Sequence, residues 1–259
     1  MSTNGKPLSG LLAAFILAVL IAAMFLAVRL VPPGWNFIGV MLLMLIFMIT
    51  IGITITGRPA GILINERNLM SLSRLQLVLW TLVILSAYLT IALERIRVRS
   101  IADALAIALD QRLWALMGIS TASLIGSPLI QTNKKLQDPK PEAVEKASAA
   151  LNESTDEINK NSQGLLYSNG GIKDAAFSDM FEGDEVGNTA YVDVAKVQMF
   201  FFTMVAGLSY GTELFYWIAS KPAADLTAFP ILSGGLVAIL GISHAGFLVN
   251  NSTTHTPTK

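Results

Sequence analysis

Few residues in this chain could do chemistry, and two of them, Glu213 and His244, lie within apolar runs long enough to cross a membrane. Ionisable groups at such positions are candidates for a proton relay, for transport or for gating. Each lies about 9 Å from its own end of a span, so roughly 12 Å of depth separates them across about 30 Å of hydrocarbon. We therefore expect no direct contact between them. Glu213, followed by Tyr216 and Trp217, has the pattern of an interfacial carboxylate beside an aromatic belt.

Patterns for catalysis, cofactors or metals are absent from the sequence. His244 and His255 are the only histidines, HExxH does not occur and there is no cysteine, so we expect neither a zinc site nor thiolate chemistry. The acidic stretch 179–185 does not meet the EF-hand spacing, and we interpret it as a solvated loop. P-loop, GxGxxG and GxSxG motifs are missing as well. The prediction is a non-enzymatic protein without a cofactor, a metal ion or catalytic residues.

A run of cationic side chains, Arg95, Arg97 and Arg99, follows the third apolar segment. Arg95 and Arg99 share a helical face if that helix continues outward, because residues four apart are neighbours on a helix surface. Contact with lipid headgroups is the favoured role for this run. A partner site or an anion site is the alternative.

The elements that must position these residues are membrane spans. The chain has 259 residues, 53% of them hydrophobic and 14% charged, whereas soluble domains carry about a quarter charged residues. A span needs roughly 20 mostly apolar residues. Six segments meet this length, and we expect the first to be retained as an anchor: Leu11–Leu30, Phe37–Thr56, Leu77–Leu93, Leu113–Ile130, Met199–Ala219 and Pro230 or Ile231 to Val249. We expect Ile101 to Arg112 to form a short interfacial helix, and Pro32, Pro33 and Gly34 to turn the first two spans into an antiparallel hairpin.

Six spans place both termini on one side of the membrane. The side that holds the termini carries more Lys and Arg near the spans, which favours a cytoplasmic location for it. The predicted location is the cell (plasma or inner) membrane, with both termini and the segment 131–197 in the cytoplasm. Net charge is zero, so no basic field recruits nucleic acid, and the lipid bilayer is the expected partner.

Self-similarity is the most informative pattern in the sequence. The segment that starts at Arg74 aligns with the segment that starts at Lys196 at an offset of 122, which pairs Gln76 with Gln198 and Thr81 with Thr203. Gly118 pairs with Gly241 at an offset of 123. Because the third and fifth spans run in the same direction, as do the fourth and sixth, we predict a parallel internal repeat. The alternative is two unrelated hairpins that share a membrane composition.

Small residues recur at helical spacing in the repeat: Gly118, Ala122 and Gly126 in its first half, and Gly241 and Ala245 in its second. Such stripes allow helix backbones to approach closely. We interpret them as packing residues rather than as a ligand site, and we expect the two hairpins to pack there. The paired residues Gln76, Gln198, Thr81 and Thr203 could instead line a pathway at the repeat interface.

The predicted fold class is all-α, a polytopic helical membrane protein. Its parts are an N-terminal hairpin (1–57), a first repeat hairpin (58–130), a polar, partly helical segment (131–197), a second repeat hairpin (198–250) and a disordered tail (251–259). Within the polar segment we expect a solvated helix over Glu142–Asn161 and a short amphipathic helix over Asp174–Phe181.

The function we expect is that of a membrane scaffold or anchor, in a homo- or hetero-oligomer that associates through the small-residue stripes. Residues 142–181 are the candidate partner-binding region. The alternative is an ion channel or a small-solute transporter.

Overall fold

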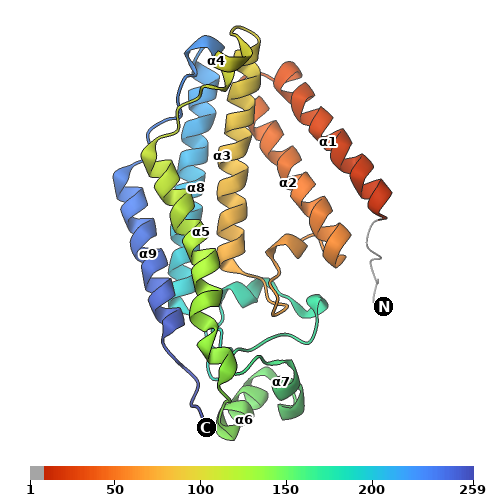
Figure 1. Cartoon of the computed structure of the whole chain (residues 1–259), viewed down its shortest axis with the longest axis vertical. Coiled ribbons are helices and arrows are strands. Elements are labelled where there is room, and N and C mark those ends of the chain that lie inside the picture. The colour runs from red at the N-terminus through yellow and green to blue at the C-terminus, as the bar shows by residue number, and fades with distance from the viewer. Residues whose placement is uncertain (1–8) are drawn as a thin grey trace. The chain divides into compact units, whose positions relative to one another are not determined.

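The computed structural model describes residues 9–259, and this part of the chain is helical, with isolated bridges but no β-strand. The α-helices are α1 (Gly10–Leu30), α2 (Trp35–Thr56), α3 (Leu72–Ile96), α4 (Ile101–Leu105), α5 (Gln111–Gln131), α6 (Pro141–Leu151), α7 (Thr155–Asn161), α8 (Val194–Ser220) and α9 (Gly234–Ser252) (Figure 1). Short 3₁₀ helices lie between them: η1 (Gly61–Leu63), η2 (Asn133–Leu136), η3 (Ile172–Asp174), η4 (Phe177–Phe181) and η5 (Ala223–Asp225).

Five helices in the described range are long and apolar enough to cross a membrane. They are α1, α2, α3, α9 and the helical run Gln111–Leu136 that contains α5. The chain is thus consistent with a multi-pass helical membrane protein. α8 is not among the five, although it has 27 residues. Its sequence carries Glu213 and several Ser, Thr, Tyr and Gly residues, which lower its mean hydropathy.

The described residues form two compact units. The first comprises residues up to Ile62, Leu77–Met117 and Met204–Val237, and the second comprises Leu63–Gln76, Gly118–Thr203 and Ala238–Lys259. Helices α3, α5, α8 and α9 therefore contribute residues to both units. The second unit joins the polar segment to the loop before α3 and to the residues that follow α9.

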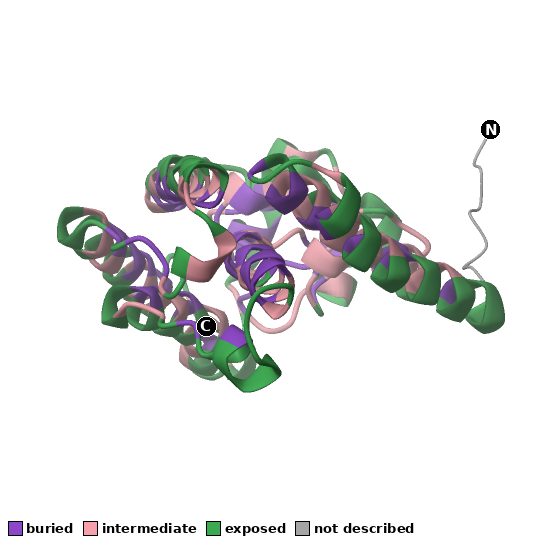
Figure 2. Cartoon of the chain, turned by 90° about the horizontal axis from the view of Figure 1, so that it is seen from above, coloured by how far each residue is buried: buried purple, intermediate pink, exposed green. Residues whose placement is uncertain are grey.

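In the first unit, α1 and α2 form the predicted antiparallel hairpin (Figure 1). Gly34 supplies the turn with a φ of 84°, and a Cβ atom there would lie 2.8 Å from the Cβ of Ala219. Only glycine adopts this conformation readily in so tight a space. Met24, Val28 and Val40 form the buried core of the hairpin, while most of α1 is exposed (Figure 2).

The expected interfacial helix Ile101–Arg112 is shorter in the structure, since α4 ends at Leu105. Residues 106–110 are not helical, and Ala108 pairs with the connection between α8 and α9. The amide of Ala108 donates to the Thr227 carbonyl at 2.9 Å, and the amide of Phe229 donates to the Ala108 carbonyl at 3.0 Å. These bonds satisfy backbone groups that an interfacial helix would have paired within itself.

In the second unit, the expected helix Glu142–Asn161 is broken into α6 and α7. Asn152 adopts the left-handed conformation with a φ of 56°, and Ser154 caps α7 through a reciprocal hydrogen bond with Glu157. The break turns the inner faces of both helices toward one core, where Val144 and Ile158 pack against Leu69, Tyr167 and Val186. The segment thus completes its core with a residue from the loop before α3.

The expectation of a disordered tail is wrong, because α9 extends to Ser252 and the residues after it are hydrogen-bonded. The Lys140 amide donates to the Pro257 carbonyl at 2.9 Å, and the Lys259 amide donates to the Asp138 carbonyl at 3.2 Å. A polar composition suggested that the tail is solvated, but its backbone groups find partners in the second unit.

Candidate functional site

A largely buried carboxylate, Asp184, whose side chain is 14% exposed, lies between two cations in the second unit. Arg67 donates to its carboxylate and, through Nη1, to its backbone carbonyl at 2.9 Å and to the Tyr167 carbonyl at 3.0 Å. The Nζ of Lys196 lies 3.1 Å from the other carboxylate oxygen and donates to the Glu182 carbonyl at 2.6 Å. These bonds join the loop before α3, the loop 182–186 and the first turn of α8.

The charge state of Asp184 follows from this enclosure. Burial by itself raises the pKa of the carboxyl, but the charges of Lys196 and Arg67 outweigh it and hold the pKa well below its usual range. Asp184 is therefore ionised, and its charge is compensated by hydrogen-bonded cations, as a buried charge requires.

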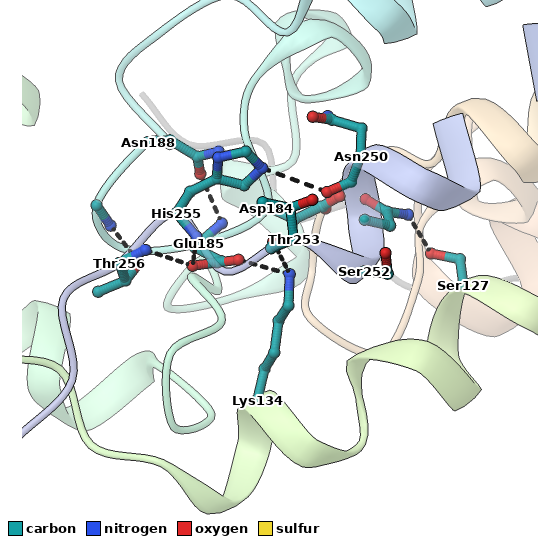
Figure 3. Close-up of polar contacts among 12 residues, drawn as sticks. Ser127, Lys134, Asp184, Glu185, Asn188, Asn250, Ser252, Thr253, His255 and Thr256 are labelled. Atoms are coloured by element: carbon teal, nitrogen blue, oxygen red, sulfur yellow. Dashed lines mark hydrogen bonds and ion pairs between the residues drawn. The ribbon is translucent and has the colours of Figure 1, made fainter. Parts of the chain in front are cut away.

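A second ion pair, Lys134 with Glu185, holds the residues that follow α9 (Figure 3). The Lys134 ammonium lies 2.6 Å from Glu185 Oε1 and also donates to the Thr253 carbonyl at 2.6 Å. The other oxygen of Glu185 accepts hydrogen bonds from the amides of His255 at 2.8 Å and Thr256 at 2.7 Å. Both charged side chains are buried, and every oxygen of the carboxylate has a partner.

A hollow of about 300 Å³ lies beside these ion pairs, lined in part by Asn188, Asp193, Asn250 and His255. Asp193 caps α8 by accepting from the Ala195 and Lys196 amides at 2.9 and 3.2 Å, and it accepts from Asn250 Nδ2 at 2.8 Å. The His255 ring Nε2 lies 3.3 Å from the Asn250 carbonyl oxygen. The polar lining is thus fixed in place by hydrogen bonds.

An apolar rim borders the hollow, formed by Tyr191, Val192 and Val194. Val192 is 68% exposed and Val194 is 73% exposed. The Nζ of Lys146 on α6 lies 5.2 Å from the centre of the Tyr191 ring, a cation–π distance. The rim therefore adjoins the predicted partner-binding region 142–181. This arrangement can bind a ligand that offers both apolar surface and hydrogen-bonding groups.

The sequence analysis did not identify these residues as a site. The stretch 179–185 is not a solvated loop, since Asp184 and Glu185 are buried in ion pairs and burial raises the pKa of Asp179 and of Glu182. Arg67 and Lys134 stand far from these carboxylates in the sequence and Lys196 lies beyond the next loop, so no helical or strand spacing signals the pairs. Among residues 9–259, no group of three or more His, Asp or Glu side chains is placed to hold a metal ion.

Of the four paired polar residues, Gln76 and Thr203 meet in the second unit. Gln76 Nε2 donates to Thr203 Oγ1 at 2.6 Å, and both side chains are buried. The structure places Gln198 on the exposed surface and leaves Thr81 partly buried. Gln76 Oε1 has no hydrogen-bond partner within the described part of the chain. The two glutamines thus have different surroundings, although the predicted repeat pairs them.

His244 is buried and lies 2.6 Å through Nδ1 from Ser123 Oγ. Along the same face of the two helices, a Cβ atom on Gly126 would lie 3.5 Å from Leu248, and Asn251 Nδ2 donates to Ser127 Oγ at 2.8 Å. Residue numbers rise together on both helices in these contacts, so α5 and α9 run parallel in the second unit.

The small-residue stripe does not form this packing surface as predicted. A Cβ atom on Gly118 would meet nothing within 4 Å, and Ala122 and Ala245 are exposed. Gly126 and Gly241 do lie against the neighbouring helix, at 3.5 Å from Leu248 and 3.7 Å from Ile119. Pairing Ser123 with His244 rotates the contact away from Gly118, because unpaired polar side chains are costly in an apolar environment.

The remaining predicted residues lie apart from one another. Glu213 is exposed. Arg95 is buried in the first unit, where its Nη1 donates to the carbonyls of Ala106 at 2.9 Å and Leu226 at 3.3 Å, so it is not placed for headgroup contact. Arg97 pairs with Glu94 at 3.3 Å, and Arg99 is exposed beyond the end of α3. Headgroup contact stays a prediction for Arg97 and Arg99.

No protein-family model matches the chain, and no curated protein or solved structure is detectably similar to it.

Proposed function

We propose that this protein is a non-enzymatic membrane scaffold that anchors in the bilayer and presents the second unit to a membrane-associated protein partner. The observation that carries the proposal is the pair of buried ion-pair groups, Arg67–Asp184–Lys196 and Lys134–Glu185. They fix the loop 182–196 before any partner arrives. A surface that is already ordered loses less conformational entropy on binding, which favours affinity.

The partner contact in this proposal is the hollow with its rim of Tyr191, Val192 and Val194. Exposed aromatic and aliphatic side chains beside fixed polar groups have the composition of a binding surface. The adjacent face of α6, which carries Lys146, extends this surface into the region 142–181.

Six spans in a parallel repeat are part of the proposal. α8 is included because it packs parallel to α3: Gln76 meets Thr203 in the second unit, and in the first unit a Cβ atom on Gly207 would lie 2.5 Å from Leu79. The parallel contacts of α5 with α9 fit the same arrangement. The proposed orientation has both termini and the segment 131–197 in the cytoplasm, with the exposed Gly118, Ala122 and Ala245 available for lateral association in an oligomer.

Site-specific photo-crosslinking in cells tests the scaffold role. A crosslinking residue at Val192 is expected to give one discrete adduct, and the same protein is expected to co-purify at fixed stoichiometry in mild detergent. Val192→Asp is expected to abolish the co-purification. The matched control is Asn159 on α7, which is also exposed. Equal labelling of many proteins from both positions, or a partner retained by Val192→Asp, would refute the proposal.

A channel or transporter is the second candidate, and one observation favours it. Several buried polar atoms in the apolar helices have no partner among residues 9–259: Gln76 Oε1, Ser120 Oγ, Ser243 Oγ and His244 Nε2. Such groups are expected where water or a polar solute passes. Reconstituted liposomes decide this: a flux that Gln76→Leu with Thr203→Val removes supports a pathway, and no flux for any ion or small solute excludes one.

A further inference from the structure

Four phenylalanine rings form a continuous chain at the start of α8. Phe177 lies 5.4 Å from Phe181 and 6.2 Å from Phe200, measured between ring centroids, and Phe181 lies 5.2 Å from Phe200. Phe200 in turn lies 5.7 Å from Phe201. All four contacts are edge-to-face, the arrangement that aromatic pairs prefer. η4 is therefore fixed to the second turn of α8 by ring contacts.

This chain of rings also lies beside the beginning of α3, one of the five helices that are long and apolar enough to cross a membrane. Phe181 and Phe200 pack against the core cluster that contains Leu72, the first residue of α3. The Met70 amide, just before α3, donates to Asp179 Oδ2 at 2.9 Å. η4 is thus held at the end of α3 where the apolar run begins.

The two phenylalanine rings at the ends of this row of four are exposed. Phe177 is 57% exposed and Phe201 is 60% exposed, whereas Phe181 and Phe200 are partly buried. Val194, seven residues before Phe201, is on the same helical face and is also exposed. The face continues along α8 with the exposed residues Val205 and Leu208.

The one acidic side chain of η4 is turned inward. Asp179 Oδ2 accepts from the amide of Ala176 as well as from that of Met70, both at 2.9 Å. Of the residues of η4, only Phe177 and Ser178 are exposed, so its outward surface carries an aromatic ring and no charged side chain. Aromatic side chains are enriched at the level of lipid headgroups, where their rings sit between hydrocarbon and water.

We propose that η4 is an interfacial anchor, in which Phe177 inserts into the boundary between headgroups and acyl chains next to the lipid-facing side of α8. The ligand is the lipid surface itself. The anchor fixes the depth of the second unit, and with it the height of the rim Tyr191–Val194 above the bilayer. This inference rests on the placement of α8 in the membrane proposed above.

Spin labels on single cysteines test the anchor, because the natural chain has no cysteine. Phe177→Cys, Leu208→Cys and Asn159→Cys are labelled one at a time in the full chain and reconstituted into vesicles of phosphatidylcholine and phosphatidylglycerol. Accessibility to oxygen, which concentrates in lipid, is compared with accessibility to a water-soluble nickel chelate. The ratio of oxygen accessibility to chelate accessibility is expected to be higher for the Phe177 label than for the Asn159 label. It is expected to be higher still for the Leu208 label.

Labels at the three positions distinguish an error in the placement of α8 from an error in the proposed anchor. If the Leu208 label is as accessible to the nickel chelate as the Asn159 label, the placement of α8 is wrong. If the Leu208 label is in lipid and the Phe177 label is as aqueous as the Asn159 label, the anchor alone is wrong. Ala176→Cys keeps all four rings and is also exposed, so a label there repeats the test if Phe177→Cys does not fold.

Discussion

At the scale of single residues, Asp184 shows what one carboxylate contributes when two cations enclose it. Its contacts with Arg67 and Lys196 connect the loop before α3, 117 residues away in the sequence, with the start of α8. A buried ion pair adds little over an apolar core, but removing one partner leaves uncompensated charge. The structure around Asp184 depends on the whole group rather than on one bond.

Asp184→Asn is expected to lower the free energy of unfolding by about 3–5 kcal/mol, since Arg67 and Lys196 would remain buried without an anion. Denaturation in detergent micelles measures this. The matched control is Glu66→Gln, which removes the exposed ion pair of Arg74 and is expected to change stability by less than about 1 kcal/mol. Similar effects from the two variants would contradict the role given to Asp184.

The depressed pKa of Asp184 makes that stabilisation depend on pH. Its contribution is present above the unfolded pKa of about 4 and is lost as pH falls through the lower folded pKa. Asp179 and Glu182 contribute to the pH dependence of stability with the opposite sign. Burial raises the pKa of each, so that each is protonated more easily in the folded state than in the unfolded state. The stability difference between the native chain and Asp184→Asn, measured from pH 7 to pH 3, is expected to shrink below about pH 4. A constant difference would show that Asp184 is not the titrating group.

At the scale of helices, polar residues and not the glycine stripe set how α5 meets α9. The pairs Ser123–His244 and Ser127–Asn251 lie about one helical turn apart on α5 and about two turns apart on α9. Hydrogen bonds between helices have few competitors in an apolar environment, so they determine the rotation of each helix. Gly118 and Ala122 are consequently left on the outer surface.

Gly118→Ala is expected to stabilise the protein by about 0.5–1 kcal/mol, because alanine favours a helix interior and its methyl group meets no atom there. Thermal unfolding in detergent measures the effect. Gly164→Ala is the contrasting variant: its φ is +63° and a Cβ atom would lie 2.5 Å from the carbonyl oxygens of Lys134 and Lys135, so it is expected to destabilise. Destabilisation by Gly118→Ala would instead restore the stripe as a packing surface.

Sequence patterns predicted the features that depend on neighbours along the chain. The hairpin at Pro32–Gly34 and the apolar helices follow from local composition and turn chemistry. Arg95 was misplaced because its acceptors, the carbonyls of Ala106 and Leu226, come from connections whose path no local pattern reveals. Arg67, Lys134 and Lys196 resembled ordinary surface cations for the same reason.

At the scale of the whole molecule, each unit depends on segments that are distant in sequence. The second unit requires the loop before α3, the segment between α5 and α8, and the residues after α9. The polar segment alone supplies only part of its core, since Val144 and Ile158 pack against Leu69. Isolated residues 131–197 are thus expected to be an incomplete fragment rather than a domain that folds by itself.

The hydrogen bonds that Glu185 accepts from the amides of His255 and Thr256 bear on the order in which the second unit forms during synthesis. Lys134 and Glu185 are synthesised before residues 253–256, so one oxygen of the Glu185 carboxylate lacks its amide partners until those residues are made. The last step in closing the second unit is therefore delayed until translation has passed Thr256.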